Sequence, residues 1–223
     1  MIMKQKIEPS LFKDPDLLWL QLSREFKTDP RTKTKFNEEL WIVSLFFCFY
    51  NREFSKSFVI CTKHSDEWDK DGIDVAVKEN AGALREIQAK YFPTLSVIEN
   101  RKRYRGPATV HINKEHAEEY LRRNTEEIEK MAVSYLKGKL RNDYDFVVIY
   151  LDTPFEQFTW LESVVAETGL ERTEIRAKEV WAFKYEKITV PRQDLNKVAG
   201  SHRYRFFRLF PKFENYKYEF RES

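Results

Sequence analysis

The sequence predicts an α/β fold, in which a mixed central β-sheet is flanked by helices. Two stretches with helical periodicity come first, three strand-like runs follow them, and a helical stretch then leads to another strong strand. Three consecutive strands indicate an antiparallel meander, and a helical crossover would place the next strand parallel to one of them. At 223 residues, with 42% hydrophobic residues, the chain is long enough to bury the core of such a domain.

Two helices are expected near the beginning of the chain. Asp14 and Pro15 suit the N-cap and the first helical position of the first helix, which ends near Lys27. The second helix covers about residues 34–50. Its second half is apolar almost all round, which indicates burial on more than one side.

Two acids, Glu38 and Glu39, stand at the polar beginning of the second helix. Glu39 comes three residues after Phe36 and four before Val43, so it borders the buried stripe of that helix. Glu38 is expected to be no more than a favourable negative charge near the helix N-terminus. Helical phase therefore selects Glu39 as the acid that can reach the interior.

Three short strands are predicted to follow the second helix. Residues 57–62 form a continuous apolar run, as expected of a strand covered on both faces. Residues 73–78 and 84–91 alternate in character and are joined by a turn that contains Gly82. Since strand side chains alternate between faces, one face of each strand is apolar and suits packing on the core. The opposite faces carry Asp74, Ala76 and Lys78 on the first strand and Glu86, Gln88 and Lys90 on the second.

The second half of the chain continues the alternation of helices and strands. A helical signal covers about residues 114–140, and residues 144–151 (YDFVVIYL) are typical of a buried strand. A further helix is expected from Thr153 to about Gly169, and residues 174–183 indicate a strand on a sheet edge. The segment from His202 is basic and aromatic. We expect an N-terminal helical extension (1–32), a core domain (33–185) and a basic aromatic C-terminal extension (186–223).

Composition limits the classes of function. The net charge is only +3, so a nucleic-acid partner must be argued from local clusters of charge. Cys48 and Cys61 stand in apolar runs and suit buried free thiols in a reducing compartment. The four histidines have no metal-ligand spacing, and the sequence contains no nucleophile elbow or Gly-rich phosphate loop.

The expected location is the cytoplasm, with no membrane partner. No signal peptide is recognisable at the beginning of the sequence. The longest apolar run, residues 40–50, is about half of the ~20 residues that a membrane helix needs.

Basic residues cluster in two segments. The first holds Arg101, Lys102, Arg103 and Arg105, and the second holds Arg203 and Arg205. An exposed basic loop suits contact with the phosphates of a nucleic acid, and a merely solvated loop is an equally good interpretation of the first segment.

The polar faces of residues 73–78 and 84–91 bring an acid, an amide and a cation, Asp74, Gln88 and Lys90, toward one point. With the Glu39 helix before them and a helix–strand crossover after them, they resemble the PD-(D/E)xK nuclease superfamily. The letters GID (72–74) and IQAK (87–90) are most similar to its Mrr-like restriction endonuclease branch, where glutamine replaces the usual second acid. The resemblance covers about residues 33–151 and implies a restriction-endonuclease-like core with the order αβββαβ.

This resemblance implies a metal-dependent nuclease that hydrolyses phosphodiester bonds, with Mg²⁺ as cofactor and Mn²⁺ as its substitute. Mg²⁺ takes hard oxygen ligands and retains several waters. Asp74 would be the central ligand, joined by the side-chain carbonyl of Gln88 and the backbone carbonyl of Ala89. Lys90 would position or help deprotonate the attacking water, or would offset phosphate charge. Glu39 would hold a metal-bound water or a second ion.

The role of Glu86 stays open between two alternatives. It lies on the same face as Gln88, about 7 Å along the strand, and is a candidate to replace or support the missing acid of the metal site. Alternatively, Glu86 pairs with Lys78 across the hairpin.

Substrate and assembly follow from the same resemblance. DNA is favoured over RNA and an endonuclease over an exonuclease, within a restriction, anti-phage defence or phage system. Cleavage of both strands needs two sites, which favours a homodimer or an assembly with a partner subunit. The neutral glutamine motivates a second hypothesis, a catalytically inactive nuclease-fold subunit that binds nucleic acid or a partner protein. A third is a protein-interaction module that docks through its aromatic C-terminal segment.

Overall fold

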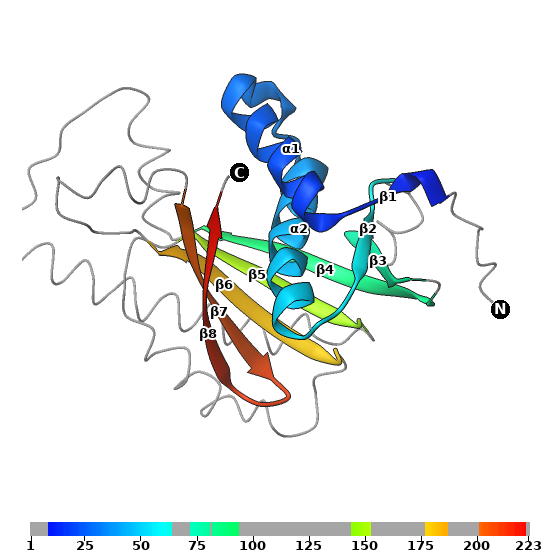
Figure 1. The fold of residues 1–223 in the computed structure, drawn as a ribbon, viewed down its shortest axis with the longest axis vertical. Coiled ribbons are helices and arrows are strands. Elements are labelled where there is room, and N and C mark those ends of the chain that lie inside the picture. The colour runs from blue at the N-terminus through cyan, green and yellow to red at the C-terminus, as the bar shows by residue number, and fades with distance from the viewer. Residues whose placement is uncertain are drawn as a thin grey trace, which may run out of the picture. The chain divides into compact units, whose positions relative to one another are not determined.

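The computed structural model describes residues 9–63, 72–80, 82–93, 144–152, 177–186 and 201–221. The chain divides into two compact units. The first unit comprises Met1–Lys90, Tyr144–Ile149 and Arg221–Ser223, and the second comprises Tyr91–Asp143 and Tyr150–Phe220. The described elements are η1 (Pro9–Leu11), β1 (Phe12–Lys13), α1 (Pro15–Thr28), η2 (Pro30–Thr32), α2 (Lys35–Glu53), β2 (Phe58–Cys61), β3 (Val75–Glu79), β4 (Leu84–Pro93), β5 (Phe146–Asp152), β6 (Glu179–Glu186), β7 (Ser201–Phe210) and β8 (Glu214–Arg221) (Figure 1).

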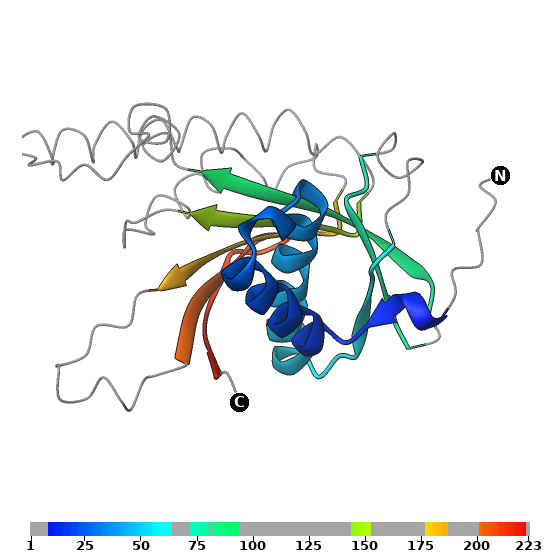
Figure 2. The ribbon, with the colours of Figure 1, turned by 90° about the horizontal axis from the view of Figure 1, so that it is seen from above.

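The predicted class, an α/β fold with a mixed sheet, is confirmed. The eight described strands lie in the sheet in the order of the sequence, from β1 to β8. β2, β3 and β4 form the predicted antiparallel meander, and β1 pairs antiparallel with β2. β5 lies beside β4, and the arrowheads of these two strands point the same way in Figure 2. β5 therefore runs parallel to β4, the last strand of the meander, as expected for a strand that follows a crossover connection.

The two predicted N-terminal helices are present. α1 begins as expected, because the Asp14 carboxylate accepts hydrogen bonds from the backbone N–H groups of Asp16 (2.9 Å) and Leu17 (3.2 Å). Pro15 occupies the first helical turn, where its missing N–H costs nothing. α2 continues to Glu53, three residues beyond the expected end at position 50.

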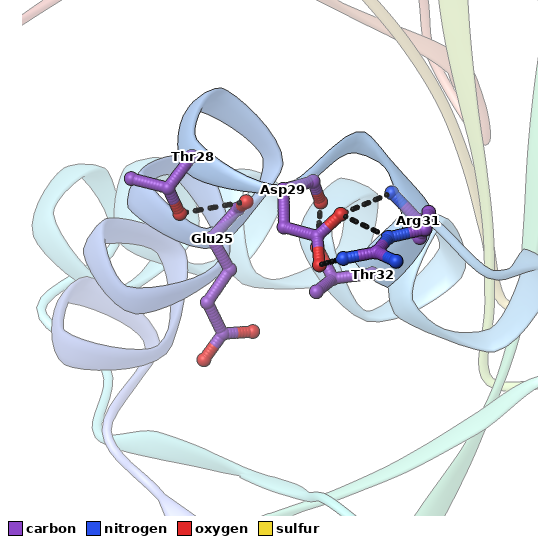
Figure 3. A network of polar contacts seen from close by, with 5 residues as sticks. All are labelled: Glu25, Thr28, Asp29, Arg31 and Thr32. Carbon is purple, nitrogen blue, oxygen red and sulfur yellow. Dashed lines mark hydrogen bonds and ion pairs between the residues drawn. The ribbon is translucent and has the colours of Figure 1, made fainter.

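A polar network turns the chain from α1 toward α2 (Figure 3). The Thr28 hydroxyl donates to the Glu25 carbonyl at the end of α1 (3.1 Å), and the Asp29 N–H donates to the same carbonyl (2.9 Å). The Asp29 carboxylate then accepts from the backbone N–H of Arg31 (3.0 Å) and from its guanidinium (2.9 and 3.0 Å). These hydrogen bonds lower the pKa of Asp29. The network ends α1 and forms the turn that leads toward α2.

Thr34 caps the beginning of α2, and its hydroxyl accepts a hydrogen bond from the Asn37 N–H (3.2 Å). Thr34→Ala is expected to lower the free energy of unfolding by about 1 kcal/mol, because this N–H loses its partner. Urea or thermal unfolding measures the loss. Thr34→Ser keeps a hydroxyl and is the matched control, which should retain most of the stability. Equal losses in the two variants would contradict the capping role.

The apolar second half of α2 packs on the strands of the first unit. Phe47 of α2 lies 5.1 Å from Phe58 of β2 and 5.5 Å from Phe146 of β5, measured between ring centroids. Tyr50 lies 5.4 Å from Phe146, and Phe46 lies 6.1 Å from it. These aromatic rings are buried, and their tilted and edge-to-face contacts add to the stabilisation from burial. Figure 1 shows α2 running across β4 and β5. This packing holds the first turns of α2 in one place relative to the strands.

The second unit contains two strands that the sequence did not predict. The segment that was expected only to be basic and aromatic forms β7 and β8. β6 and β7 pair antiparallel, from Val180↔Phe210 to Glu186↔Arg203. The strand predicted over residues 174–183 corresponds to β6, which lies between β5 and β7. The expectation that it forms a sheet edge is therefore wrong, because β7 and β8 extend the sheet beyond it.

The helices predicted over residues 114–140 and 153–169 lie outside the described residues. Within the described ranges, neither helix combines the length and the apolar character that a membrane crossing requires.

Candidate metal and phosphodiester site

Asp74 is delivered to the interior by a turn immediately before β3. Gly72 has a φ of 72°, in the left-handed region that glycine adopts without strain. Two residues later the Asp74 N–H donates to the carbonyl of Ile87 (3.1 Å), which attaches the backbone to β4 before the regular ladder begins at Val75↔Ile87. Asp74 is only 6% exposed. A carboxylate this deeply buried needs partners or a cation.

The Asp74 carboxylate has two partners on β4. Its Oδ2 accepts a hydrogen bond from the Ala89 N–H (2.9 Å) and forms an ion pair with Lys90 Nζ (3.3 Å). The Lys90 side chain is 25% exposed, so its amine stands between the buried acid and solvent. Within the described part of the chain, the hydrogen bonds that reach this carboxylate end on Oδ2. Oδ1 is therefore the oxygen that a cation would take.

Gln88 lies beside Asp74 and is 7% exposed. Its Nε2 donates long hydrogen bonds to the Gly72 carbonyl (3.5 Å) and to the Tyr144 hydroxyl (3.4 Å). Its Oε1 is buried and has no hydrogen-bond partner. A buried carbonyl oxygen without a donor costs about 1–3 kcal/mol, so such an oxygen is uncommon in a folded protein. Coordination of a hard cation would satisfy it.

Glu39 brings a second acid from α2, as helical phase predicted, and is 8% exposed. Burial raises the pKa of Glu39, and the nearby Asp74 carboxylate raises it further. Lys35, whose Nζ lies 3.4 Å from Glu39 Oε1, lowers the pKa in part, as does Lys90. Glu39 is thus close enough to Asp74 and Lys90 to interact with both electrostatically. The two acids and the two lysines therefore interact electrostatically, and we refer to them, with the Gln88 amide, as the buried group.

The raised pKa of Glu39 predicts a pH-dependent effect on stability. A carboxyl whose pKa is higher in the folded state makes the folded state less stable once pH rises through that pKa, and has no effect below its ordinary value of 4.5. Glu39→Gln should therefore raise the free energy of unfolding near pH 7 and change it little near pH 4. Urea unfolding at the two pH values measures the difference.

The matched control for this prediction is Glu38→Gln. Glu38 lies in the first turn of the same helix and pairs with Lys33 (3.1 Å) at a solvent-facing position, as expected for a charge near the helix N-terminus. Its removal should lower stability slightly, because the helix loses a favourable acid. A Glu39→Gln chain that is less stable than the unmodified chain at pH 7 would contradict the electrostatic assignment.

Glu86 lies on the same face of β4 as Gln88 but is exposed. It stands opposite the buried Ala76 in the ladder. Its backbone is attached just before the start of β5, because the Glu86 N–H donates to Asp145 Oδ2 and the Asp145 N–H donates to the Glu86 carbonyl, both at 3.1 Å. The Nζ of Lys78, its alternative partner, lies over the ring of Phe12 at 3.8 Å from the centroid. The buried group is thus formed without the Glu86 side chain.

The basic residues that the sequence selected fall either outside the described residues or in the second unit. Arg101, Lys102, Arg103 and Arg105 lie outside the described residues. Arg203 and Arg205 belong to β7 in the second unit, where they pair with Glu219 (3.4 Å) and Glu186 (3.0 Å). Their positive charges are therefore offset by neighbouring acids on the sheet.

The donor atoms of the group suit a hard cation. A carboxylate oxygen of Asp74 and the amide oxygen of Gln88 are the kinds of ligand that Mg²⁺ and Mn²⁺ prefer. The backbone carbonyl of Ala89 is a further predicted ligand. The contact of Ala89 with Asp74 in the structure is made by the Ala89 N–H, which donates to the Asp74 carboxylate. Among the described residues, no cluster of three or more His, Cys, Asp or Glu forms a metal site. Cys48 and Cys61 are free and buried, as predicted, and burial raises the pKa of both thiols.

One member of the group, Lys35, and one residue in contact with it, Tyr144, were not selected from the sequence. Lys35 precedes Glu39 by four residues, and this spacing is the signal that could have identified it. Tyr144 was assigned only to a buried strand, and its hydroxyl reaches Gln88 across 56 positions of sequence. Nothing local in the sequence indicates that contact.

Comparisons with protein-family models, with curated proteins and with solved structures found no match for this chain.

Proposed function

We propose that this chain is a metal-dependent nuclease that hydrolyses phosphodiester bonds. The observation that carries the proposal is the buried amide oxygen of Gln88, which has no hydrogen-bond partner and lies beside the buried carboxylate of Asp74. Lys90 Nζ stands 3.3 Å from that carboxylate. An acid, an amide oxygen and an amine in this arrangement suit a site that binds a divalent cation next to a phosphate.

The roles of the residues follow from their positions. Mg²⁺, when bound, supplies charge neutralisation at the phosphate and acidifies water. Asp74 Oδ1 and Gln88 Oε1 would hold it, and the Ala89 N–H keeps the carboxylate oriented through Oδ2. Lys90 Nζ is placed to hold or deprotonate the attacking water, or to offset charge on the phosphate. Glu39, whose pKa is raised, is placed to accept a proton or to orient a water at the edge of the group.

The fold proposed for this function is a restriction-endonuclease-like core. α2, the meander β2 to β4 and the strand β5 supply the helix and four strands of the order αβββαβ. We propose DNA as the substrate in preference to RNA, endonucleolytic cleavage, and a place in restriction, anti-phage defence or phage biology. Each of these rests on the resemblance of residues 72–74 and 87–90 to the Mrr-like branch.

The direct test is digestion of supercoiled plasmid DNA and of RNA by the purified chain. Nicked or linear plasmid should form in the presence of Mg²⁺. It should not form when EDTA is present from the start, and it should form again when Mn²⁺ is added in excess of the EDTA. A chain that is well folded by circular dichroism but leaves DNA and RNA intact with either ion would overturn the proposal.

One observation favours a second candidate, a nuclease-fold subunit that binds nucleic acid without cutting it. Both acids of the group are ion-paired with lysines, Asp74 with Lys90 and Glu39 with Lys35, so the four ionised side chains carry no net charge. Such a group attracts a divalent cation less strongly than a cluster of acids would. Salt-dependent DNA binding that EDTA leaves unchanged, together with no cleavage, would establish this alternative.

A further inference from the structure

The orientation of the Gln88 amide is set entirely from its nitrogen side. Nε2 donates to the Gly72 carbonyl (3.5 Å) and to the Tyr144 hydroxyl (3.4 Å), while Oε1 has no donor. The Gly72 carbonyl can only accept, so it requires Nε2 and not Oε1 on that side. The Tyr144 oxygen accepts from the same nitrogen. Together these two acceptors turn Oε1 away from themselves.

Amide orientation matters here in a way that it would not for an acid. A carboxylate presents an oxygen whichever way it rotates, whereas an amide turned by half a revolution presents an NH₂ group, which repels a cation. A glutamine in place of the usual acid therefore needs neighbouring hydrogen-bond partners that keep its oxygen directed toward the cation.

Tyr144 is itself held in place. It is 2% exposed and immediately precedes Asp145, whose carboxylate accepts from the Glu86 N–H and whose own N–H donates to the Glu86 carbonyl, both at 3.1 Å. Glu86 is two residues before Gln88 on the same strand, so the anchor and the amide belong to one rigid segment. The Tyr144 hydroxyl thus reaches the amide from a fixed position.

We propose that Tyr144 is a positioning residue, whose hydroxyl keeps the Gln88 carbonyl oxygen directed toward the cation. The inference rests on the proposed function, because it assigns the oxygen to a metal. It predicts that the tyrosine hydroxyl is required for metal affinity only while position 88 carries an amide.

The experiment is calorimetric titration of Mn²⁺ into the full chain without nucleic acid. Tyr144→Phe should weaken Mn²⁺ binding by roughly tenfold, the usual scale for loss of a residue that orients a metal ligand. Tyr50→Phe is the matched control, because it removes a phenol hydroxyl from the aromatic cluster near the far end of α2, and it should leave the affinity unchanged. At saturating Mg²⁺ the cleavage rate of Tyr144→Phe should return to that of the unmodified chain, since the hydroxyl does not contact substrate.

A double-mutant cycle separates positioning from a merely structural role. In the Gln88→Glu background, Tyr144→Phe should weaken Mn²⁺ binding by much less than tenfold, because either carboxylate oxygen of Glu can bind the ion. An equal loss in both backgrounds, or no loss in the original one, would overturn the role of Tyr144 and leave the nuclease proposal standing. If the unmodified chain binds no Mn²⁺ and cuts no DNA or RNA, both proposals fail.

Discussion

Lys90→Ala is expected to reduce Mg²⁺-dependent cleavage by about 10²–10⁴-fold, the range typical of a residue that moves or positions a proton in the reaction. Lys90 Nζ lies 3.3 Å from the buried Asp74 carboxylate, and its side chain is 25% exposed. It can therefore meet both the cation ligands and a phosphate that arrives from solvent. Plasmid digestion under single-turnover conditions measures the loss.

Two companion variants sharpen this expectation. Lys90→Arg keeps the positive charge but cannot deprotonate water, so partial rescue would indicate that charge is the main contribution and no rescue would indicate proton transfer. Lys78→Ala removes a lysine from the polar face of β3, where it lies over Phe12, and should leave cleavage unchanged. A Lys90→Ala chain that cuts at the original rate would contradict the assignment of Lys90.

Asp74→Asn is expected to abolish both metal binding and cleavage, with a fall in rate of about 10³-fold or more, because it removes the central negative ligand of the cation. The side chain keeps its shape, and an Asn oxygen can still accept from the Ala89 N–H, so the fold should be retained. Mn²⁺ affinity measured by calorimetry should fall together with the cleavage rate. Lys90→Ala, in contrast, should retain metal binding, because it removes a competing cation from Asp74.

Asp16→Asn is the matched control for this variant. Asp16 Oδ1 pairs with Arg52 (2.6 Å), in the same unit but outside the buried group. Removal of its charge should change neither Mn²⁺ affinity nor cleavage. If Asp74→Asn binds Mn²⁺ as tightly as the unmodified chain does, the cation is held elsewhere and the proposed ligand set is wrong.

The parts of this fold that could be predicted are those determined by local pattern. The N-cap at Asp14 and the alternation of residues 73–78 and 84–91 depend on neighbours within a few positions, and both are present in the structure. The register Val75↔Ile87 places the predicted apolar faces together, which leaves Asp74 and Gln88 on the other face. The position of Glu39 was predicted from helical phase alone, because phase decides which side of α2 faces inward.

What could not be predicted depends on contacts between distant segments. The position of β6 inside the sheet could be predicted only by knowing that β7 forms beside it. In β7 the alternation of Tyr204 and Phe206 with arginines was a strand signal, but the basic and aromatic composition suggested an extension instead. The hydroxyl of Tyr144 reaches Gln88 only because β5 lies next to β4, and strand order is not a local property.

The central claim is that one divalent cation binds between Asp74 and Gln88. The measurement that tests it most directly is a crystal structure with Mn²⁺, in which anomalous scattering locates the ion. We expect a peak about 2.0–2.2 Å from an Asp74 carboxylate oxygen and from Gln88 Oε1, with waters in the remaining positions. A structure with no anomalous peak at this point, in which Gln88 Oε1 instead accepts a hydrogen bond from a protein donor, would contradict the claim.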